Sequence, residues 1–186
     1  MYYRSFASLK MTKKGNNMKI AIISDIHDNL VNLENCLNWC NKNGIKEIIC
    51  CGDITNSETL NFLASNFKNT IHLIKGNIEL YNEAELEQYR NIKYYSKIGK
   101  IELESIVIGF CHEPYLAEKL ARQGGYDIIF YGHTHKPWIE EKDEIKIINS
   151  GTLSAMFQKA TFAVMEDDKI ELKILENLGT GKRLGW

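Results

Sequence analysis

The stretch Lys19–Asn29, KIAIISDIHDN, joins an apolar run directly to a group of polar residues. The run Ile20–Ile23 is typical of a short buried strand, and it is followed at once by Asp25, His27, Asp28 and Asn29. A strand that is apolar along its whole length indicates a sheet covered on both faces. In such folds the binding site lies beyond the carboxyl ends of the strands. The stretch therefore predicts an α/β fold with a polar site after its first strand.

The same arrangement recurs four times further along the chain. Each time, an apolar run of β type ends in a short turn that carries a side chain able to bind a metal ion. The runs and their polar residues are Ile48–Cys51 before Asp53, Ile71–Ile74 before Asn77, Ile106–Cys111 before His112, and Ile128–Tyr131 before His133 and His135. We therefore expect five strands to bring these side chains to one site.

The segments between the runs indicate the fold class. Helices are predicted over Leu30–Asn43 and after a capping box formed by Thr55 and Glu58. Alternating strands and helices imply parallel pairing with right-handed crossovers. From Ile92 onward the strands follow one another closely, which predicts a second sheet packed against the first. We expect a single domain over residues 18–176, an α/β two-sheet sandwich flanked by helices.

Length, composition and charge narrow the functional classes. A chain of 186 residues can bury one sizeable core, and no apolar run reaches the roughly 18 residues of a membrane span. We expect residues 1–17, which are basic, to be a disordered or non-core extension, and residues 177–186 to form a loose tail. The rest of the chain has 19 basic and 24 acidic side chains. That acidic balance disfavours broad nucleic-acid binding.

The five cysteines show no pattern of a disulfide framework or a zinc site. Cys36 and Cys40 are four residues apart on a predicted helix, and Cys50 and Cys51 are adjacent on a predicted strand. Neither pair has CxxC spacing, so we interpret them as small buried side chains. Because no secretory signal accompanies them, we expect a reducing compartment and a cytoplasmic protein.

Seven side chains at the strand ends form the candidate site: Asp25, His27, Asp53, Asn77, His112, His133 and His135. Carboxylate, imidazole and amide oxygen suit divalent ions such as manganese, iron or zinc. One ion would use about four of these groups, whereas two ions about 3.5–4 Å apart use all seven if one carboxylate bridges them. Such a pair stabilises the attacking and leaving oxygens of a phosphoryl displacement. His72, inside an apolar strand, is interpreted as a packing residue.

The segments DIHDN, GD, GN, CHEP, GHTH and NSGT, in that order, resemble the calcineurin-like metallophosphoesterase superfamily, especially its small stand-alone prokaryotic phosphodiesterases. The resemblance covers nearly the whole chain from Met18 to Glu176 and implies a four-layer α/β/β/α fold. It implies that one metal ion is bound by Asp25, His27, Asp53 and His135. It implies that the other is bound by Asp53, Asn77, His112 and His133, with Asp53 as the bridge.

The resemblance implies hydrolysis of a small phosphate ester, most simply a diester, by a hydroxide that bridges two divalent metal ions. We expect manganese, with iron, nickel or zinc as alternatives, and a direct part in catalysis for Asp53, Asn77 and His112. Two other functions stay open: a non-catalytic, protein-binding scaffold on the same fold, like the metallophosphoesterase-like subunit of the retromer coat, and a nuclease. We expect no membrane partner, and self-association into a homo-oligomer also stays open.

The chain departs from the superfamily at one position. Many members have a histidine directly after the GN asparagine, proposed to protonate the leaving group or to stabilise the transition state. Here Ile78 and Glu79 follow, which disfavours esters with poorly acidic leaving groups. We interpret Glu79 as a surface or helix-capping carboxylate, with a role behind the ligands or as a substitute acid as the alternative. Asn29 and Asn149 fit either a turn or cap or a position behind the ligands.

Overall fold

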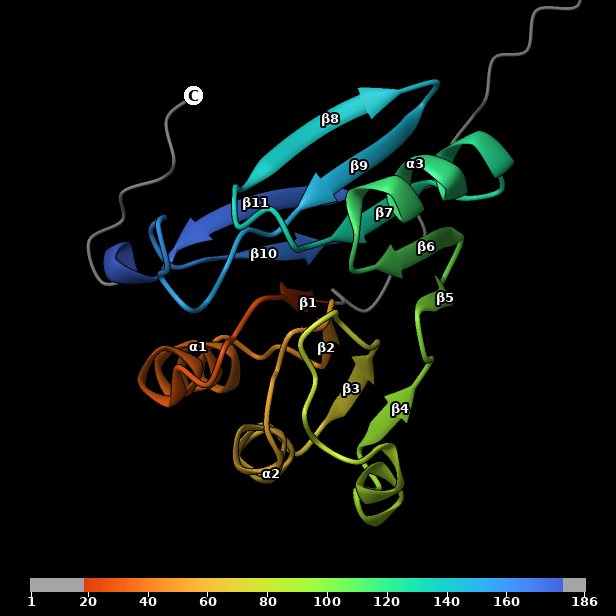
Figure 1. The fold of residues 1–186 in the computed structure, drawn as a ribbon. Helices are drawn as coiled ribbons and strands as arrows, with labels where there is room; N and C mark the ends of the chain where they lie inside the picture. Colours follow the sequence, from red (N-terminus) through yellow and green to blue (C-terminus); the bar gives the residue numbers. More distant parts are fainter. Residues whose placement is uncertain (1–18, 179–186) are drawn as a thin grey trace, which may run out of the picture.

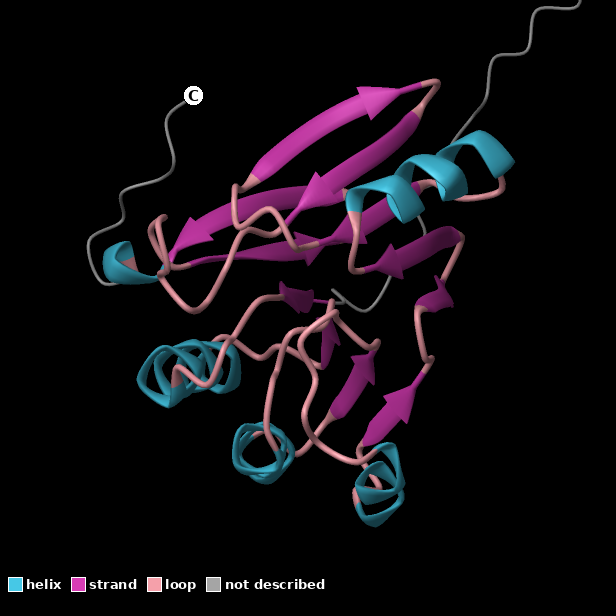
Figure 2. Cartoon of the chain, viewed as in Figure 1, coloured by secondary structure: helices cyan, strands magenta, loops and turns pink. Residues whose placement is uncertain are grey.

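Two β-sheets face each other at the centre of the fold, and helices cover their outer faces (Figures 1 and 2). The computed structural model describes residues 19–178. The expected extension of residues 1–17 lies outside this range, and so does the expected tail, apart from residues 177 and 178. The layers run helix, sheet, sheet, helix, which confirms the predicted α/β sandwich.

The first sheet contains β1 (Lys19–Ile23), β2 (Glu47–Cys50), β3 (Thr70–Leu73), β4 (Ile92–Tyr94), β10 (Thr161–Glu166) and β11 (Lys169–Ile174). Its strand order is β11-β10-β1-β2-β3-β4. The strands β1 to β4 are parallel, and they are linked by α1 (Leu30–Lys42), α2 (Ser57–Asn66) and the 3-10 helix η1 (Glu83–Gln88). These parallel crossovers confirm the prediction for the first half of the chain.

The second sheet contains β5 (Ile98–Leu103), β6 (Ile106–Cys111), β7 (Ile128–Tyr131), β8 (Trp138–Lys142) and β9 (Ile145–Asn149). Its order is β5-β6-β7-β9-β8, and α3 (Pro114–Gln123) covers its outer face. A last 3-10 helix, η2 (Leu175–Asn177), follows β11. Within residues 19–178, every helix is too short or too polar to span a bilayer.

The prediction that all strands from Ile92 onward form the second sheet is wrong for three of them. The strand β4 pairs with β3, and β10 pairs antiparallel with β1, with Lys19 opposite Glu166. The physical reason is the free edge of β1. An unpaired edge strand exposes a row of backbone donors and acceptors, and the β10–β11 hairpin covers that edge.

The start of α2 also differs from the prediction. Asn56, not Thr55, is the N-cap, and its side chain accepts a hydrogen bond from Thr59 N at 2.9 Å. The backbone N–H of Thr55 instead donates to Glu79 Oε2 at 2.8 Å. The predicted capping box of Thr55 and Glu58 is therefore wrong, because Thr55 belongs to the loop that precedes the helix and asparagine is at least as good a cap.

Three apolar clusters hold the layers together. The first packs α1 and α2 on the first sheet, the second fills the space between the sheets, and the third packs α3 on the second sheet. Phe162, on β10, is fully buried in the first cluster and meets the Trp39 ring of α1 edge-on, with centroids 5.4 Å apart. All five cysteines are buried and none forms a disulfide, which confirms their interpretation as core residues.

Replacing Phe162 by alanine should leave a cavity between β10 and α1. We expect Phe162→Ala to lower the free energy of unfolding by about 3–5 kcal/mol, measured by urea denaturation. Val31→Ala, at a side chain that is 68% exposed on α1, is the control and should change stability by less than about 0.5 kcal/mol. Equal losses for the two variants would contradict this packing.

Candidate metal centre

The seven side chains singled out in the sequence come together at one end of the two sheets. They lie in the loops that follow β1, β2, β3, β6 and β7. Asp25, Asp53 and His112 are buried, His27 and His135 are half-buried, and Asn77 and His133 are exposed. The group is therefore anchored inside the protein and open to solvent on one side.

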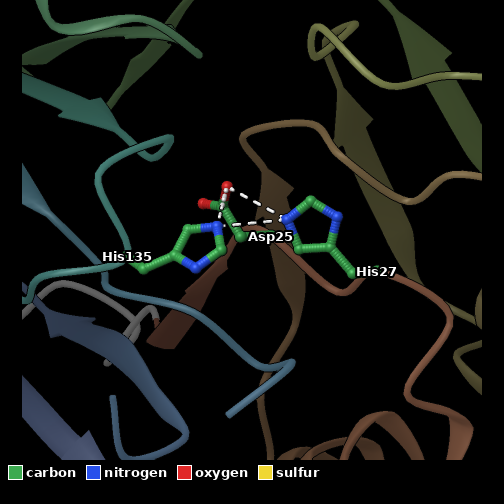
Figure 3. A group of neighbouring side chains, drawn as sticks. All are labelled: Asp25, His27 and His135. Carbon is green, nitrogen blue, oxygen red and sulfur yellow. Dashed lines mark hydrogen bonds and ion pairs between the residues drawn. The ribbon is translucent and has the colours of Figure 1, made fainter. Parts of the chain in front are cut away.

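Asp25 lies between the imidazoles of His27 and His135, which are far apart in the sequence (Figure 3). Its Oδ1 is 3.3 Å from His135 Nε2 and 3.8 Å from His27 Nε2. The two Nε2 atoms are 3.1 Å apart. Figure 3 shows both rings turned toward the carboxylate and toward each other. The three donor atoms could thus bind one ion.

A second group lies beside the first. His112 Nε2 is 2.7 Å from Asn77 Oδ1 and 3.3 Å from Asp53 Oδ2. His133 Nδ1 is 2.8 Å from Asn77 Oδ1 and 3.2 Å from His112 Nε2. These four side chains come from four different loops, so only the folded chain brings them together.

Asp53 faces both groups. Its Oδ2 lies 3.7 Å from His27 Nε2 in the first group and 3.3 Å from His112 Nε2 in the second. Its other oxygen, Oδ1, accepts a hydrogen bond from the backbone N–H of Ile78 at 2.9 Å. One carboxylate oxygen is therefore fixed by the main chain while the other faces both sets of donors. The Asp25 carboxylate also lies near both groups, because it is close to Asp53 and His112 as well as to His27 and His135.

The hydrogen-bonding roles of these atoms fit a cation. His112 Nδ1 is 2.8 Å from the carbonyl oxygen of Cys51, which can only accept, so Nδ1 carries the proton. In the neutral ring, Nε2 then presents a lone pair toward Asn77 Oδ1, which is also an acceptor. Asp25 Oδ1 is fully buried and has no hydrogen-bond donor. A buried acceptor without a partner is costly, and a divalent ion would satisfy Asp25 Oδ1 together with the neighbouring acceptors.

The negative charges of Asp25 and Asp53 act to raise the pKa of two histidines, His112 and His135. Asp25 raises the pKa of His135, although partial burial opposes this. Burial, the largest single effect on His112, would lower its pKa, but Asp53, Asp25 and the Cys51 carbonyl together raise it. Burial would likewise raise the pKa of Asp25, yet the neighbouring histidines bring it well below the usual value for aspartate. The site is thus a region of strong negative potential that favours positive charge.

The backbone is strained at five of the seven candidate ligands. A positive φ occurs at Asp25 (53°), His27 (43°), Asp53 (55°), His133 (69°) and His135 (60°). Few non-glycine residues adopt this conformation, and clusters of them occur at functional sites. Each left-handed residue turns the chain sharply at the strand end, which aims the side chain at the shared centre.

Close approach of the loops depends on glycines next to the ligands. A Cβ at Gly132 would lie 1.9 Å from Ser24 Oγ and 2.5 Å from Asp25 Oδ2. A Cβ at Gly76 would lie 2.0 Å from Asp53 Oδ1. The absence of a side chain at these two positions lets the loops after β7 and β3 pack directly against the carboxylates.

Glu79 joins two of the ligand loops, so its interpretation as a surface or helix-capping carboxylate is wrong. Its Oε2 accepts from Thr55 N at 2.8 Å, and its Oε1 accepts from Gly76 N at 3.1 Å and from Ile54 N at 3.3 Å. Burial raises the pKa of Glu79, and these N–H groups act in the opposite direction. The carboxylate thereby ties the loop of Asp53 to the loop of Asn77.

Asn29 and Asn149 act behind the ligands. Asn29 caps α1 and also donates to Ser154 O at 3.0 Å. Asn149 Nδ2 donates to Gly132 O at 2.7 Å and to Thr134 Oγ1 at 2.9 Å, which orders the loop that carries His133 and His135. Asn29 is therefore both a cap and a link between loops, and Asn149 supports a ligand loop.

His72 lies away from the site, as its position within a strand predicted. It is 3% exposed, and its two ring nitrogens interact with Glu47 Oε2 at 2.5 Å and Tyr95 Oη at 2.8 Å. It is a hydrogen-bonded residue of the core, which confirms the interpretation.

Two residues that support the site were not predicted from the sequence. Thr152 Oγ1 donates to the carbonyl oxygen of Asp25 at 2.8 Å, and the backbone N–H of Ser154 donates to the same oxygen at 2.9 Å. They fix the left-handed turn at Asp25. The NSGT segment was the one signal that could have indicated them, because it contains Thr152 and lies beyond another strand end.

Comparison with known proteins agrees with this geometry. The model of the calcineurin-like phosphoesterase superfamily domain matches residues 18–169. The chain belongs to this superfamily. Phosphodiesterase MJ0936 of Methanocaldococcus jannaschii is 26% identical over 168 residues, which is 84% of this chain and 97% of the relative. Phosphodiesterase YfcE of Escherichia coli is 22% identical over 174 residues, 86% of this chain and 94% of the relative.

The superfamily relatives also include sorting proteins. Vacuolar protein sorting-associated protein 29 of Schizosaccharomyces pombe is 29% identical over 134 residues, 68% of this chain and 64% of the relative. Among solved structures, an archaeal phosphodiesterase superposes with a TM-score of 0.76 at 23% identity, covering 84% of this chain and 99% of its own. Vps29 of Entamoeba histolytica complexed with Zn²⁺ gives 0.65 at 19% identity, covering 89% and 95%. These superpositions confirm the metallophosphoesterase fold.

Removing the Glu79 carboxylate should loosen the two loops that it joins. We expect Glu79→Ala to lower the free energy of unfolding by about 2 kcal/mol, because three partly buried N–H groups lose their acceptor. Glu79→Gln, which keeps one acceptor oxygen, should lose less. The measurement is urea denaturation of the metal-free protein.

The matched control is Glu83→Ala, which removes a carboxylate paired with Lys75 at the surface. Its effect should be below about 1 kcal/mol. A Glu79→Ala variant as stable as Glu83→Ala would show that Glu79 does not tie the loops.

Proposed function

We propose that this chain is a metal-dependent phosphodiesterase that binds two divalent metal ions and hydrolyses a small phosphate ester. The observation that carries the proposal is the position of Asp53 Oδ2 between His27 Nε2 and His112 Nε2. A single oxygen that faces both sets of donors suits a bridging ligand. The phosphodiesterases among the relatives support the same activity.

The donor set divides into two. The proposed ligands of the first ion are Asp25, His27, Asp53 and His135. The proposed ligands of the second ion are Asp53, Asn77, His112 and His133. Oxygen and imidazole donors suit manganese best in this setting, with iron, nickel and zinc as alternatives. When bound, the two ions supply positive charge to the phosphoryl oxygens and lower the pKa of a water molecule that can then act as nucleophile.

The protein's own contribution is to hold the donors in place before substrate arrives. Five left-handed backbone turns aim the side chains inward, and the Ile78 N–H fixes Asp53 through its second oxygen. Cys51 O holds the His112 ring so that Nε2 faces the site. Sites organised in this way lose little free energy to rearrangement during the reaction. Asp53, Asn77 and His112 lie next to one another and are the residues we propose to act directly.

A second candidate function is a protein-binding scaffold, which the likeness to vacuolar protein sorting-associated protein 29 favours. The complete set of seven donor side chains favours catalysis instead, because a scaffold has no need to maintain strained turns around them. We also propose a cytoplasmic location, since the buried thiols suit a reducing compartment.

Metal content and turnover test the proposal together. We expect purified protein to bind about two manganese ions per chain, measured by elemental analysis after dialysis. Hydrolysis of bis(4-nitrophenyl) phosphate should appear with manganese and stop with a chelator. A protein that binds no metal and shows no manganese-stimulated turnover would be a scaffold.

The bridging role of Asp53 gives a sharper test. Asp53→Asn should lower kcat/KM on the order of a thousandfold, because the change affects both ions. Asn77→Ala, at a ligand of one ion, should lower it about ten- to a hundredfold. Asp143→Asn, in the exposed turn between β8 and β9, is the control and should leave turnover unchanged. Equal, small losses for Asp53→Asn and Asn77→Ala would contradict the bridge.

A further inference from the structure

The large exposed apolar side chains gather at the end of the molecule that carries the candidate ligands. Nine such side chains are exposed among residues 19–178. Eight lie in the loops that follow β1, β3, β6, β7 and β9, or in the first residues of the next element. The ninth, Ile98, pairs with Cys111, next to His112. Single exposed apolar residues are ordinary, but a concentration at one end indicates a binding surface.

Four of these side chains lie in loops that contact the ligands directly. We call Ile78, Leu80, Met156 and Phe157 the apolar rim. Ile78 and Leu80 are 45% and 77% exposed, and the N–H of Ile78 donates to Asp53 Oδ1. Met156 and Phe157 are 46% and 91% exposed. The N–H of Met156 donates to Ser154 Oγ at 3.2 Å, and the N–H of Ser154 donates to the carbonyl oxygen of Asp25 at 2.9 Å.

The two parts of the apolar rim adjoin different candidate ligands. Neighbouring donor atoms can be followed from His135 through His27, Asp53 and His112 to Asn77. The loop of Met156 is hydrogen-bonded to Asp25, whose Oδ1 is 3.3 Å from His135 Nε2, whereas Ile78 is hydrogen-bonded to Asp53 and follows Asn77 in sequence. Apolar side chains therefore adjoin the candidate ligands on two separate loops.

The loop that presents Phe157 is built into the fold. Ser154 N donates to the carbonyl oxygen of Asp25, and Ser154 Oγ accepts from Met156 N at 3.2 Å. Phe157 itself has a positive φ of 62°. The positive φ is a strained conformation, and it holds a large apolar ring in solvent. Burial of that ring against a bound molecule would be favourable.

The charged side chains beside the ligand loops are engaged elsewhere. Lys75 Nζ pairs with Glu83 Oε1 at 2.6 Å, and Lys136 Nζ lies 5.5 Å from the centre of the Trp138 ring. Glu79 is turned inward to three backbone N–H groups. The four side chains of the rim thus offer apolar contact to a substrate and carry no charge of their own.

We propose that the substrate is a phosphodiester monoanion whose two ester substituents are apolar or aromatic, and that the apolar rim binds those substituents. The proposal rests on the proposed function. The two substituents of a diester leave phosphorus in different directions, so a phosphate at the ligands would direct one toward Ile78 and the other toward Phe157. A phosphomonoester has one substituent and a second charge, and it would use only half of this surface.

Binding of inert analogues tests the proposal without turnover. Diphenylphosphinate and dimethylphosphinate are both monoanions, and neither has an ester bond to hydrolyse. Isothermal titration into manganese-loaded protein should give at least about tenfold tighter binding of diphenylphosphinate, because the phenyl groups bury apolar area. Ile78→Thr and Phe157→Asn should each weaken its binding about three- to tenfold and leave dimethylphosphinate unchanged.

The control is Ile106→Thr, the same substitution at a half-buried isoleucine at the start of β6, the opposite end of that strand from His112. It should leave the binding of both phosphinates unchanged. Asparagine is chosen at position 157 because it tolerates a positive φ. Thermal melts and metal analysis of each variant confirm that the fold and the metal content are intact.

The outcomes separate this inference from the proposed function. If the protein hydrolyses bis(4-nitrophenyl) phosphate but binds the two phosphinates equally, the rim does not bind substituents and the inference alone is overturned. If light scattering shows a dimer that Phe157→Asn converts to a monomer, the rim binds a second copy of the chain and the inference is also overturned. Absence of any metal binding would overturn both.

Discussion

The mutual repulsion of converging acceptors is the constraint on which the site depends. Two carboxylates, an amide oxygen and the lone pairs of imidazoles meet within a few ångströms, and the Asp25 Oδ1 atom has no donor at all. Such an arrangement is unfavourable for a protein by itself. It persists because the strands that precede these groups are fixed by three clusters of buried apolar side chains. A cation at the centre would turn the same repulsion into attraction.

The supporting structure around the ligands is as specific as the ligands. Glu79 ties the loop of Asp53 to that of Asn77, Asn149 orders the loop of His133, and Thr152 fixes the backbone at Asp25. Each of these contacts joins loops from different strands. Outer contacts of this kind orient the side chains that bind metals and strengthen their binding. The strained turns persist because this network of hydrogen bonds holds the loops in place.

The convergence of the seven candidate ligands could be predicted from the sequence, because apolar runs that end in polar turns are a local signal. The layers and the parallel crossovers followed from the same spacing. The sheet membership of β4, β10 and β11 did not, since strand pairing depends on which edges are free after folding. The left-handed turns at Asp25 and Asp53 could not be predicted either, because no residue type other than glycine identifies a positive φ by itself. The position of Glu79 was not predicted because two of its three partners are backbone atoms 24 and 25 residues away.

The pairing of β1 with β10 has a consequence for synthesis on the ribosome. The strand β1, which precedes Asp25 and His27, leaves the ribosome before β2 to β9, yet its antiparallel neighbour β10 follows all of them. Until Thr161–Glu166 has emerged, one side of β1 has no partner, and contacts of such long sequence separation form slowly. Nascent chains therefore carry an unpaired edge of β1 until β10 is made, and assistance from chaperones would matter most at that stage.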